Sequence, residues 1–277
     1  MINEYKFRGR LNKCFNSDKI YIDESRGSWS KKFDNVIKNC LISNGVVQKS
    51  NFDLSYLHEN VSDNFMKTDT AGDGISNLGK LFYEIKDEKY FDLYHSFLYW
   101  LRYKILKCDF YFQKTPTIRF WFAGQKTLTR YHTDMDLGHP PQEINIWWAF
   151  TKNKNTGFVI ADNLSDCERW YGAHDFDRDL FWKNANSNNL DFNKTGESIT
   201  TKANSNLIYM FDSRLIHSAI DRSGDDTTRV SIDVRVNPVE DFKSGYSGGN
   251  SRMSAKFEPG GLYGYHEKSI DQLWSKK

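Results

Sequence analysis

Between residues 117 and 236 the sequence carries eight short runs of β-forming residues, and this series constrains the possible fold more than any other feature. Turn-forming residues separate most of the runs, as expected between the strands of an antiparallel barrel. The runs are residues 117–123, 128–134, 143–151, 157–162, 198–202, 206–212, 215–220 and 227–236. Eight short strands in about 120 residues are typical of a jelly roll, a double-stranded β-helix. We therefore predict a mainly β core combined with helices, in the α+β class.

Two of the runs indicate which side of the barrel each strand buries, because successive side chains of a strand point to opposite faces. In the run 143–151 one face is apolar and consists of Ile144, Ile146, Trp148 and Phe150. The other face is mixed and suits a ligand cavity; it consists of Glu143, Asn145, Trp147 and Ala149. The run 227–236 sets valine and isoleucine against Arg229, Ser231, Asp233 and Arg235. We expect helices over the apolar faces and a polar cavity inside. The aromatic residues, 16% of the chain, are expected mainly around the outside of the barrel.

Apolar residues at helical spacing precede the β region. They occupy residues 30–42 and 78–105, and the charged stretch 86–89 is expected to split the second pattern into two helices. We expect one domain over residues 1–277. Its parts would be a mainly helical cover at 1–110, a jelly-roll core at 111–240 with an insertion at 163–196, and a tail at 241–277. Both the insertion and the glycine- and serine-rich tail are candidates for a lid.

Charge and cysteine content exclude several classes of protein. Lys and Arg number 38 against 36 Asp and Glu, without a basic cluster, so nucleic acid and membrane surfaces are disfavoured as partners. The first residues lack the apolar stretch of a secretion signal, and no apolar run reaches the length of a membrane span. The four cysteines, Cys14, Cys40, Cys108 and Cys167, form no CxxC pair and are expected as free thiols. We expect a cytoplasmic protein; the sequence does not indicate its oligomeric state.

The segment YHTDMD, residues 131–136, carries the clearest chemical signal. His132 and Asp134 are two positions apart on a predicted strand, so both side chains leave the same face and suit neighbouring positions on one metal ion. His217, on the seventh run, is the natural third ligand. Two histidines and one carboxylate form the facial triad of non-haem Fe(II) oxygenases, which leaves other metal positions open.

Arg229 and Ser231 follow on the last run and share one face. A guanidinium fork beside a hydroxyl suits the distal carboxylate of a dicarboxylate such as 2-oxoglutarate. Arg235 lies on the same face and is a rival for this role, but Arg229 is favoured because it is nearer to His217 and has Ser231 beside it.

HTD at 132–134, His217 and RVS at 229–231 resemble the HxD…H…RxS signature of Fe(II)/2-oxoglutarate-dependent oxygenases. The order of these motifs, together with the strand at 143–151 and the TG at 156–157, is similar to the phytanoyl-CoA hydroxylase-like branch. The resemblance covers residues 117–236. The stretch ADNLSD at 161–166 departs from the longer Gly-Ser-His stretch that the branch often carries, so the resemblance does not extend to the substrate contacts.

This resemblance implies roles for individual residues. His132, Asp134 and His217 would hold Fe(II), and Arg229 with Ser231 would bind the C5 carboxylate of 2-oxoglutarate. Asn145 and Trp147 would lie near the co-substrate. The resemblance also implies that O2 is consumed, that succinate and CO2 are formed, and that hydroxylation is the default outcome. Because Asp134 is present, the chain does not resemble the halogenating members, which leave that ligand position to chloride.

The substrate is indicated only by the polar residues expected to face the cavity. The expected substrate contacts are Trp147, Arg130, Asp233 and Arg235. They suit a polar small molecule such as a sugar, an aminocyclitol or an amino-acid derivative. Asp136 and His139 compete as metal ligands. Asp136 leads toward the expected loop GHPPQ, residues 138–142, which contains His139, so both are expected in a lid or in solvent.

Two other classes of function remain open from the sequence. One is a metal-dependent cupin isomerase or dioxygenase that does not use 2-oxoglutarate, although such proteins usually need three or four histidine ligands and the chain has seven histidines in all. The other is a non-catalytic ligand-binding jelly roll.

Overall fold

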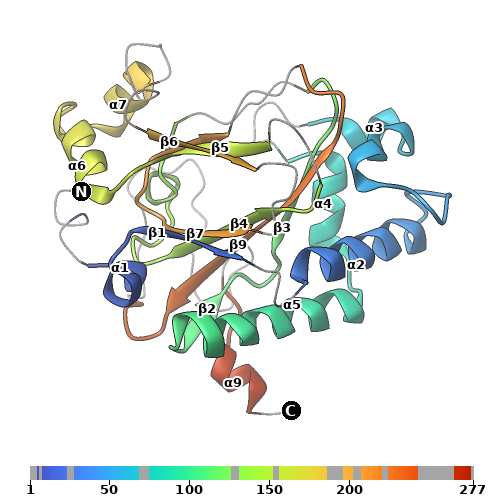
Figure 1. Ribbon diagram of the computed structural model, residues 1–277, viewed down its shortest axis with the longest axis horizontal. Coiled ribbons are helices and arrows are strands. Elements are labelled where there is room, and N and C mark those ends of the chain that lie inside the picture. Colours follow the sequence, from blue (N-terminus) through green and yellow to red (C-terminus); the bar gives the residue numbers. More distant parts are fainter. Residues whose placement is uncertain are drawn as a thin grey trace.

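A computed structural model of the protein describes residues 5, 8–23, 28–68, 75–125, 131–151, 156–185, 196–201, 207–219, 224–242 and 265–275. Two antiparallel sheets face each other in this part of the chain (Figure 1). The larger sheet has six strands. Five follow the order β1 (Lys19–Asp23), β7 (Leu207–Asp212), β4 (Ile144–Ala149), β9 (Arg229–Pro238) and β2 (Phe110–Phe112), and β3 (Thr117–Trp121) also pairs with β9.

The smaller sheet has three strands in the order β6 (Gly196–Thr201), β5 (Thr156–Ala161) and β8 (His217–Ala219). His132 extends this sheet through an antiparallel bridge to His217. From β4 onward the chain crosses repeatedly between the two sheets, because β4, β7 and β9 belong to the larger sheet and β5, β6 and β8 to the smaller one. This winding is a double-stranded β-helix, so the predicted jelly-roll class is confirmed.

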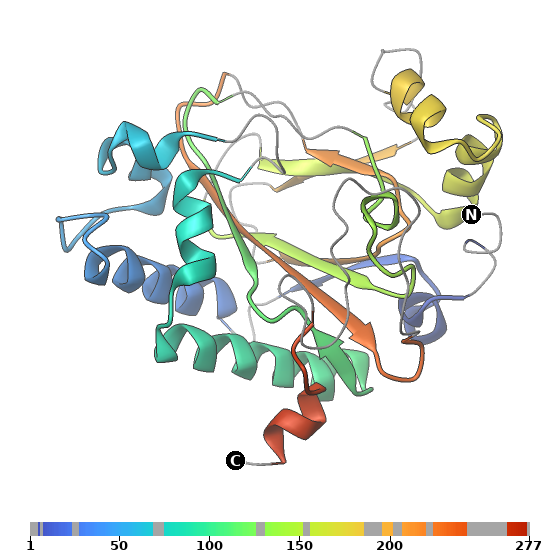
Figure 2. The same cartoon turned by 180° about the vertical axis from the view of Figure 1, so that it is seen from behind.

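Helices cover the outer face of the larger sheet (Figures 1 and 2). The covering helices include α2 (Trp29–Ser43), α4 (Asn77–Glu84) and α5 (Glu88–Trp100). Trp148 of β4 points toward them, with its ring centroid 5.6 Å from Phe33 of α2 and 4.8 Å from Phe97 of α5. All three rings are fully buried, and burying each contributes about 1.5–3 kcal/mol to folding. The predicted helical cover and the predicted outward face of residues 143–151 are confirmed.

The predicted division of the second helical pattern is also confirmed. Helix α4 ends at Glu84, and the Asp87 side chain accepts a hydrogen bond from the backbone N–H of Tyr90 to begin α5. A π-helical turn, η4 (Leu101–Leu106), continues α5. The shorter helical segments before the barrel are α1 (Arg10–Phe15), η3 (Leu54–Glu59) and α3 (Asp63–Met66).

Three elements differ from the sequence prediction. The expected helical cover contains a strand, β1, which pairs along the edge of the larger sheet with β7, and a further short strand, β2, begins at its end. The predicted strand at 128–134 is not regular. Residues 128–130 lie outside the described residues, His132 makes a single bridge, and Asp134 leads into the helical turn η5 (Met135–Leu137). Thr133 and Asp136 stabilise this turn because each side chain accepts a hydrogen bond from the backbone N–H of the other.

The inside of the barrel carries more rings than expected. Trp147 of β4, Phe158 of β5, and Tyr209 and Phe211 of β7 form a buried cluster between the sheets, with neighbouring ring centroids 5.0–6.0 Å apart. The reason is register. Trp147 is paired with Tyr209 across β4 and β7, so these rings share the face that also carries the polar residues of β4. The expectation that rings pack mainly outside the barrel was therefore wrong for this wall.

Two helices follow β5, namely α6 (Leu164–Gly172) and α7 (Arg178–Ala185), and they form the described part of the predicted insertion. The rest of it, 186–195, lies outside the described residues, as do residues 243–264 of the predicted tail. The end of the tail is not a flexible loop: Tyr265 bridges to Gln113, and α9 (Ile270–Trp274) follows. Among the described residues, no helix is long and apolar enough to cross a membrane.

Candidate metal centre

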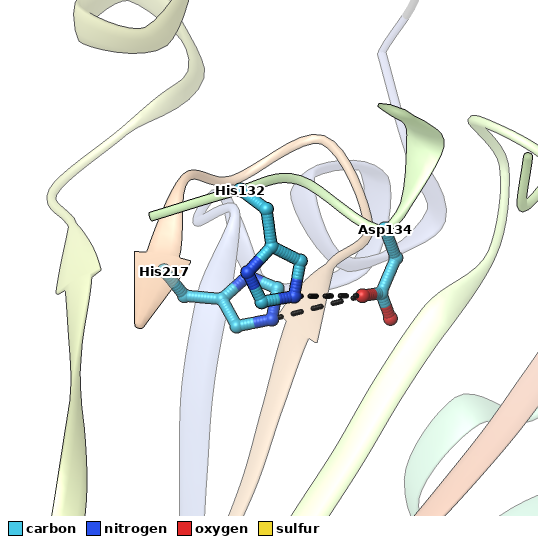
Figure 3. A group of neighbouring side chains, drawn as sticks. All are labelled: His132, Asp134 and His217. Atoms are coloured by element: carbon cyan, nitrogen blue, oxygen red, sulfur yellow. Dashed lines mark ion pairs between the residues drawn. The ribbon is translucent and has the colours of Figure 1, made fainter. Parts of the chain in front are cut away.

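His132, Asp134 and His217 converge at the edge of the smaller sheet (Figure 3). The Oδ1 atom of Asp134 lies 3.6 Å from Nε2 of His132 and 3.7 Å from Nε2 of His217. The backbone holds the two histidines side by side, since each donates its N–H to the carbonyl of the other, at 3.1 and 2.9 Å. Donor atoms that share one ion at about 2.1 Å from each are roughly 3–4 Å apart. The spacing of the three atoms therefore suits one metal ion.

The local structure sets the protonation state that a metal ligand needs. The Nδ1 atom of His217 lies 2.9 Å from the carbonyl oxygen of Leu215, which makes Nδ1 the donor and leaves Nε2 as the free base facing Asp134. Burial, and next the neighbouring His132, lower the pKa of His217 to about 4, so its ring is neutral at neutral pH. Burial opposes the charge on Asp134, but Arg235 and the histidines outweigh it and hold the pKa of this carboxyl well below its usual range.

The other oxygen of Asp134 contacts Arg235 of β9. The Nε and Nη2 atoms of Arg235 donate to Oδ2 of Asp134 at 3.1 and 3.0 Å. Arg235 Nε also lies 3.5 Å from Oε1 of Glu143, the residue just before β4. Arg235, expected as a substrate contact, thus lies against a candidate metal ligand.

Asp134 also belongs to a second group of possible ligands, with His139 and Glu143. The guanidinium of Arg235 contacts both carboxylates of this group, so we regard it as an ion-pair cluster. Asp136 and His139 were expected in a lid or in solvent, and this expectation was wrong: their exposed fractions are 4% and 9%. The turn after Asp134 folds both residues back into the interior, where Tyr171 of α6 donates a hydrogen bond to Asp136.

Arg229 and Ser231 lie on the inward face of β9. The guanidinium carbon of Arg229 is 5.7 Å from the ring centroid of Trp121 and 5.8 Å from that of Trp147, and Nη1 donates to the carbonyl of Gly157 at 3.2 Å. Contacts of a cation with two ring faces hold it in a fixed place. Ser231 is fully buried beside it.

Several buried polar atoms on this inner surface have no hydrogen-bond partner among the described residues. They are Oγ of Ser231, Oδ1 of Asn145 and Nε1 of Trp121. Such an atom costs about 1–3 kcal/mol when it stays unpaired, so a surface that carries three of them fits a polar ligand. Together with two nitrogen donors and one carboxylate, this lining fits an iron ion accompanied by a small dicarboxylate.

The remaining predicted contact residues fall in different places. Trp147 lies in the interior ring cluster, and Asp233 faces inward but is paired with Arg119 of β3, whose Nε lies 2.6 Å from its Oδ2. Arg130 lies outside the described residues. The sequence analysis did not identify Arg119, although alternation along the run 117–123 places this residue on the inward face. It did not identify Tyr265 either, for which the sequence carries no signal.

A cavity of about 240 Å³ lies between the two sheets near β1. Its lining residues are Ser17, Lys19, Ile20, Tyr21, Ile160, Tyr209, Met210 and Phe211. It reaches the candidate metal centre through Phe211, whose ring centroid is 5.0 Å from that of His217. Ile160 is paired with His217 across β5 and β8. The cavity thus lies one side chain away from a candidate ligand.

No protein-family model matches the sequence, and no curated protein matches it either. Solved structures of similar fold include AviO1 from Streptomyces viridochromogenes Tue57, 11% identical, with a TM-score of 0.48 over 86% of this chain and 97% of that one. EctD from S. alaskensis with bound Fe is 11% identical, with a TM-score of 0.47 over 93% and 87% of the chains. SnoK, a non-haem α-ketoglutarate-dependent carbocyclase from nogalamycin biosynthesis, is 12% identical, with a TM-score of 0.42 over 85% of each chain.

These similar structures thus include non-haem iron and 2-oxoglutarate-dependent enzymes. At such identities the comparison concerns the fold alone. Membership of the phytanoyl-CoA hydroxylase-like branch therefore stays a prediction.

Proposed function

We propose that the protein is a non-haem Fe(II)- and 2-oxoglutarate-dependent oxygenase. The observation that carries this proposal is the buried set of two imidazole nitrogens and one carboxylate oxygen, all within 4.8 Å of one another inside a double-stranded β-helix. Two histidines and one carboxylate are the donor set of the facial triad. A cupin with three or four histidine ligands is less well supported, because the next nearest histidine, His139, contacts Glu143 at 2.9 Å instead.

In this proposal His132, Asp134 and His217 hold the iron. Bound iron would supply the activation of O2, coupled to decarboxylation of 2-oxoglutarate to succinate and CO2. Arg229 binds the distal carboxylate of 2-oxoglutarate with its charge, and Ser231 donates its hydroxyl proton to the same group. The rings of Trp121 and Trp147 keep the Arg229 guanidinium in place for that contact.

The barrel also favours exclusion of water around the reacting groups. The side chains of Asp134 and Glu143 are 3% or less exposed, and those of His132 and His217 are 11% and 14% exposed. A dry site strengthens the ion pairs that hold the ligands and limits side reactions with water.

We further propose that the substrate is a compact polar metabolite, such as a sugar, an aminocyclitol or an amino-acid derivative, and that hydroxylation is the default reaction. The cavity of about 240 Å³ beside Phe211 limits the size of the part that enters. Its wall combines the Tyr21 and Tyr209 rings with the polar groups of Ser17 and Lys19. A ligand with both an apolar face and polar groups would suit such a wall. The four free cysteines fit the expected cytoplasmic location.

The proposal is tested by measuring succinate release from 2-oxoglutarate in the presence of Fe(II), O2 and pools of candidate metabolites. We expect one pool to stimulate release in the native protein. Release should be lost in His132→Ala and His217→Ala, and kept in the matched control His95→Ala, since His95 lies on α5, outside the barrel. Full release by either ligand variant would reject the ligand assignment.

A further inference from the structure

A chain of buried polar contacts leads from the C-terminal segment to the candidate metal ligand Asp134. The Tyr265 hydroxyl donates a hydrogen bond to Oε2 of Glu143. The other oxygen of Glu143 lies 3.5 Å from Nε of Arg235, and Arg235 in turn donates two hydrogen bonds to Oδ2 of Asp134. Three contacts therefore connect Tyr265 with the carboxylate of Asp134, a residue far away in the sequence.

Tyr265, Glu143 and Asp134 of this chain of contacts are deeply buried, whereas the side chain of Arg235 is 16% exposed. Tyr265 and Glu143 are each 1% exposed and Asp134 is 2% exposed. A buried carboxylate needs paired and hydrogen-bonded neighbours, and Glu143 has them in Tyr265, Arg235 and His139. Burial, followed by the charge of Glu143, raises the pKa of Tyr265 well above its usual value, and its hydroxyl therefore remains a proton donor.

The backbone fixes where the Tyr265 hydroxyl lies. Tyr265 forms a bridge to Gln113, and the N–H of His266 donates to the carbonyl of Phe112 at 2.7 Å. The His266 ring stacks on Phe112, with centroids 5.0 Å apart and planes 13° apart. Helix α9 is tied down further by a paired contact of Arg102 with Asp271 at 2.8–3.0 Å. The C-terminal segment thus holds Tyr265 against the edge strand β2.

The two oxygens of Asp134 have different neighbours. Oδ1 faces the two histidines, whereas Oδ2 is taken by Arg235. This division fixes the rotation of the carboxylate, and it depends on the position of the guanidinium. Glu143 contributes to that position, because its Oε1 lies 3.5 Å from the same Nε atom of Arg235 that donates to Asp134. The same Oε1 atom also lies 2.9 Å from Nδ1 of His139.

We propose that Tyr265 is a positioning residue for the metal centre: it orients Glu143, which places Arg235, which turns Oδ1 of Asp134 toward His132 and His217. This inference rests on the proposed function, since it assigns a role in holding the metal that the function needs. It extends the site to the last residues of the chain. Removing the hydroxyl leaves Oε2 of Glu143 without this donor and frees the carboxylate to turn, so Arg235 and Asp134 lose their fixed geometry.

Cobalt(II) binding provides the test, because Co(II) replaces Fe(II) at such donor sets and its visible absorption reports ligand geometry. Groups that orient metal ligands typically contribute 10–100-fold to metal affinity, and we expect about a 10-fold weaker Co(II) affinity in Tyr265→Phe, with an altered visible spectrum. The matched control is Tyr94→Phe. The hydroxyl of Tyr94 is buried and donates to the carbonyl of Gln113 at 2.7 Å, so this variant loses a comparable hydrogen bond next to the same segment.

Tyr94→Phe should bind Co(II) with native affinity and a native spectrum. If Tyr265→Phe does not fold, as judged by circular dichroism, Glu143→Gln replaces it and should show the same change of spectrum. Native affinity and spectrum in the folded variant would reject the positioning role while leaving the metal site in place. Failure of the native protein to bind Co(II), or equal binding by His217→Ala, would instead reject the proposed metal centre, and the role of Tyr265 with it.

Discussion

Arg235 and Asp134 form a two-pronged contact in which the guanidinium takes one carboxylate oxygen and leaves the other to the histidines. Nε and Nη2 of Arg235 lie 3.1 and 3.0 Å from Oδ2 of Asp134. The contact explains how a carboxylate that is only 2% exposed remains charged, and it joins the last long strand of the barrel to the turn that carries the HTD motif. The two inward-facing arginines of β9 thus have different surroundings: Arg235 contacts Asp134, whereas Arg229 lies near the rings of Trp121 and Trp147.

The first prediction concerns Arg235. Replacing it by Met keeps much of its volume but leaves the buried charge of Asp134 without its partner, which typically costs 3–5 kcal/mol, so we expect about this loss in the free energy of unfolding without metal. Adding Co(II) should recover more stability in Arg235→Met than in the native protein, because the ion offsets the carboxylate charge. Urea unfolding with and without Co(II) measures both quantities. Equal stability of variant and native protein without metal would contradict the account.

Replacing Arg229 should weaken the binding of 2-oxoglutarate more than the binding of the metal. Hydrogen bonds to a charged group are worth about 1.5–3 kcal/mol, so Arg229→Gln is expected to weaken 2-oxoglutarate binding by roughly 10–100-fold. Calorimetric titration of 2-oxoglutarate into the Co(II)-loaded protein gives this value. The test compares the two variants. If Arg235→Met weakens the binding of 2-oxoglutarate more than Arg229→Gln does, then Arg235 and not Arg229 binds the co-substrate.

Metal removal should lower thermal stability. A ligand that binds only the folded state, at about 100 times its Kd, stabilises that state by about 2.7 kcal/mol. For a chain of this size we therefore expect Co(II) to raise Tm by roughly 5–10 °C, and a chelator to reverse the rise. His132→Ala should show no such rise under the same conditions. A rise of native size in that variant would place the bound metal elsewhere.

Acidification should loosen the C-terminal segment through His266. Burial lowers the pKa of His266 below its ordinary value of 6.5, so the folded state favours the neutral ring. The stability that His266 contributes is complete above the pKa of the unfolded chain and is lost as the pH falls below it, toward the lower folded pKa. Tm of the native protein should therefore drop more than that of His266→Phe between about pH 7.5 and about pH 5. Parallel curves for the two proteins would contradict this interpretation.

The sequence predicts the barrel well because its pattern is local. Alternation in residues 143–151 correctly assigns Trp148 to the helical side, where Phe33 and Phe97 contact it. The strand β1 was missed because it has only five residues and its pairing partner, β7, lies far along the chain. Edge strands of this kind are selected by the sheet that they join, and local propensity reports little of that.

In the site too, the residues of local motifs were predicted from the sequence, whereas contacts between distant segments were not. The structure brings His132, Asp134 and His217 together, although Asp134 reaches the histidines from a helical turn and not from the predicted strand. The contacts of Arg235 with Asp134 and of Tyr265 with Glu143 join segments that no spacing rule connects. The first contact depends on the packing of β9 against the turn after His132, and the second on the docking of the C-terminal segment, so both become visible only in three dimensions.

Anaerobic addition of Fe(II) and 2-oxoglutarate tests the central claim most directly, because it needs no knowledge of the substrate. If both bind at the site of His132, Asp134 and His217, the native protein and the His95→Ala control should develop a weak visible charge-transfer band. The band should require both additions and should be missing in His217→Ala. A native protein that binds Fe(II) yet gives no band with 2-oxoglutarate would contradict the assignment as a 2-oxoglutarate-dependent oxygenase.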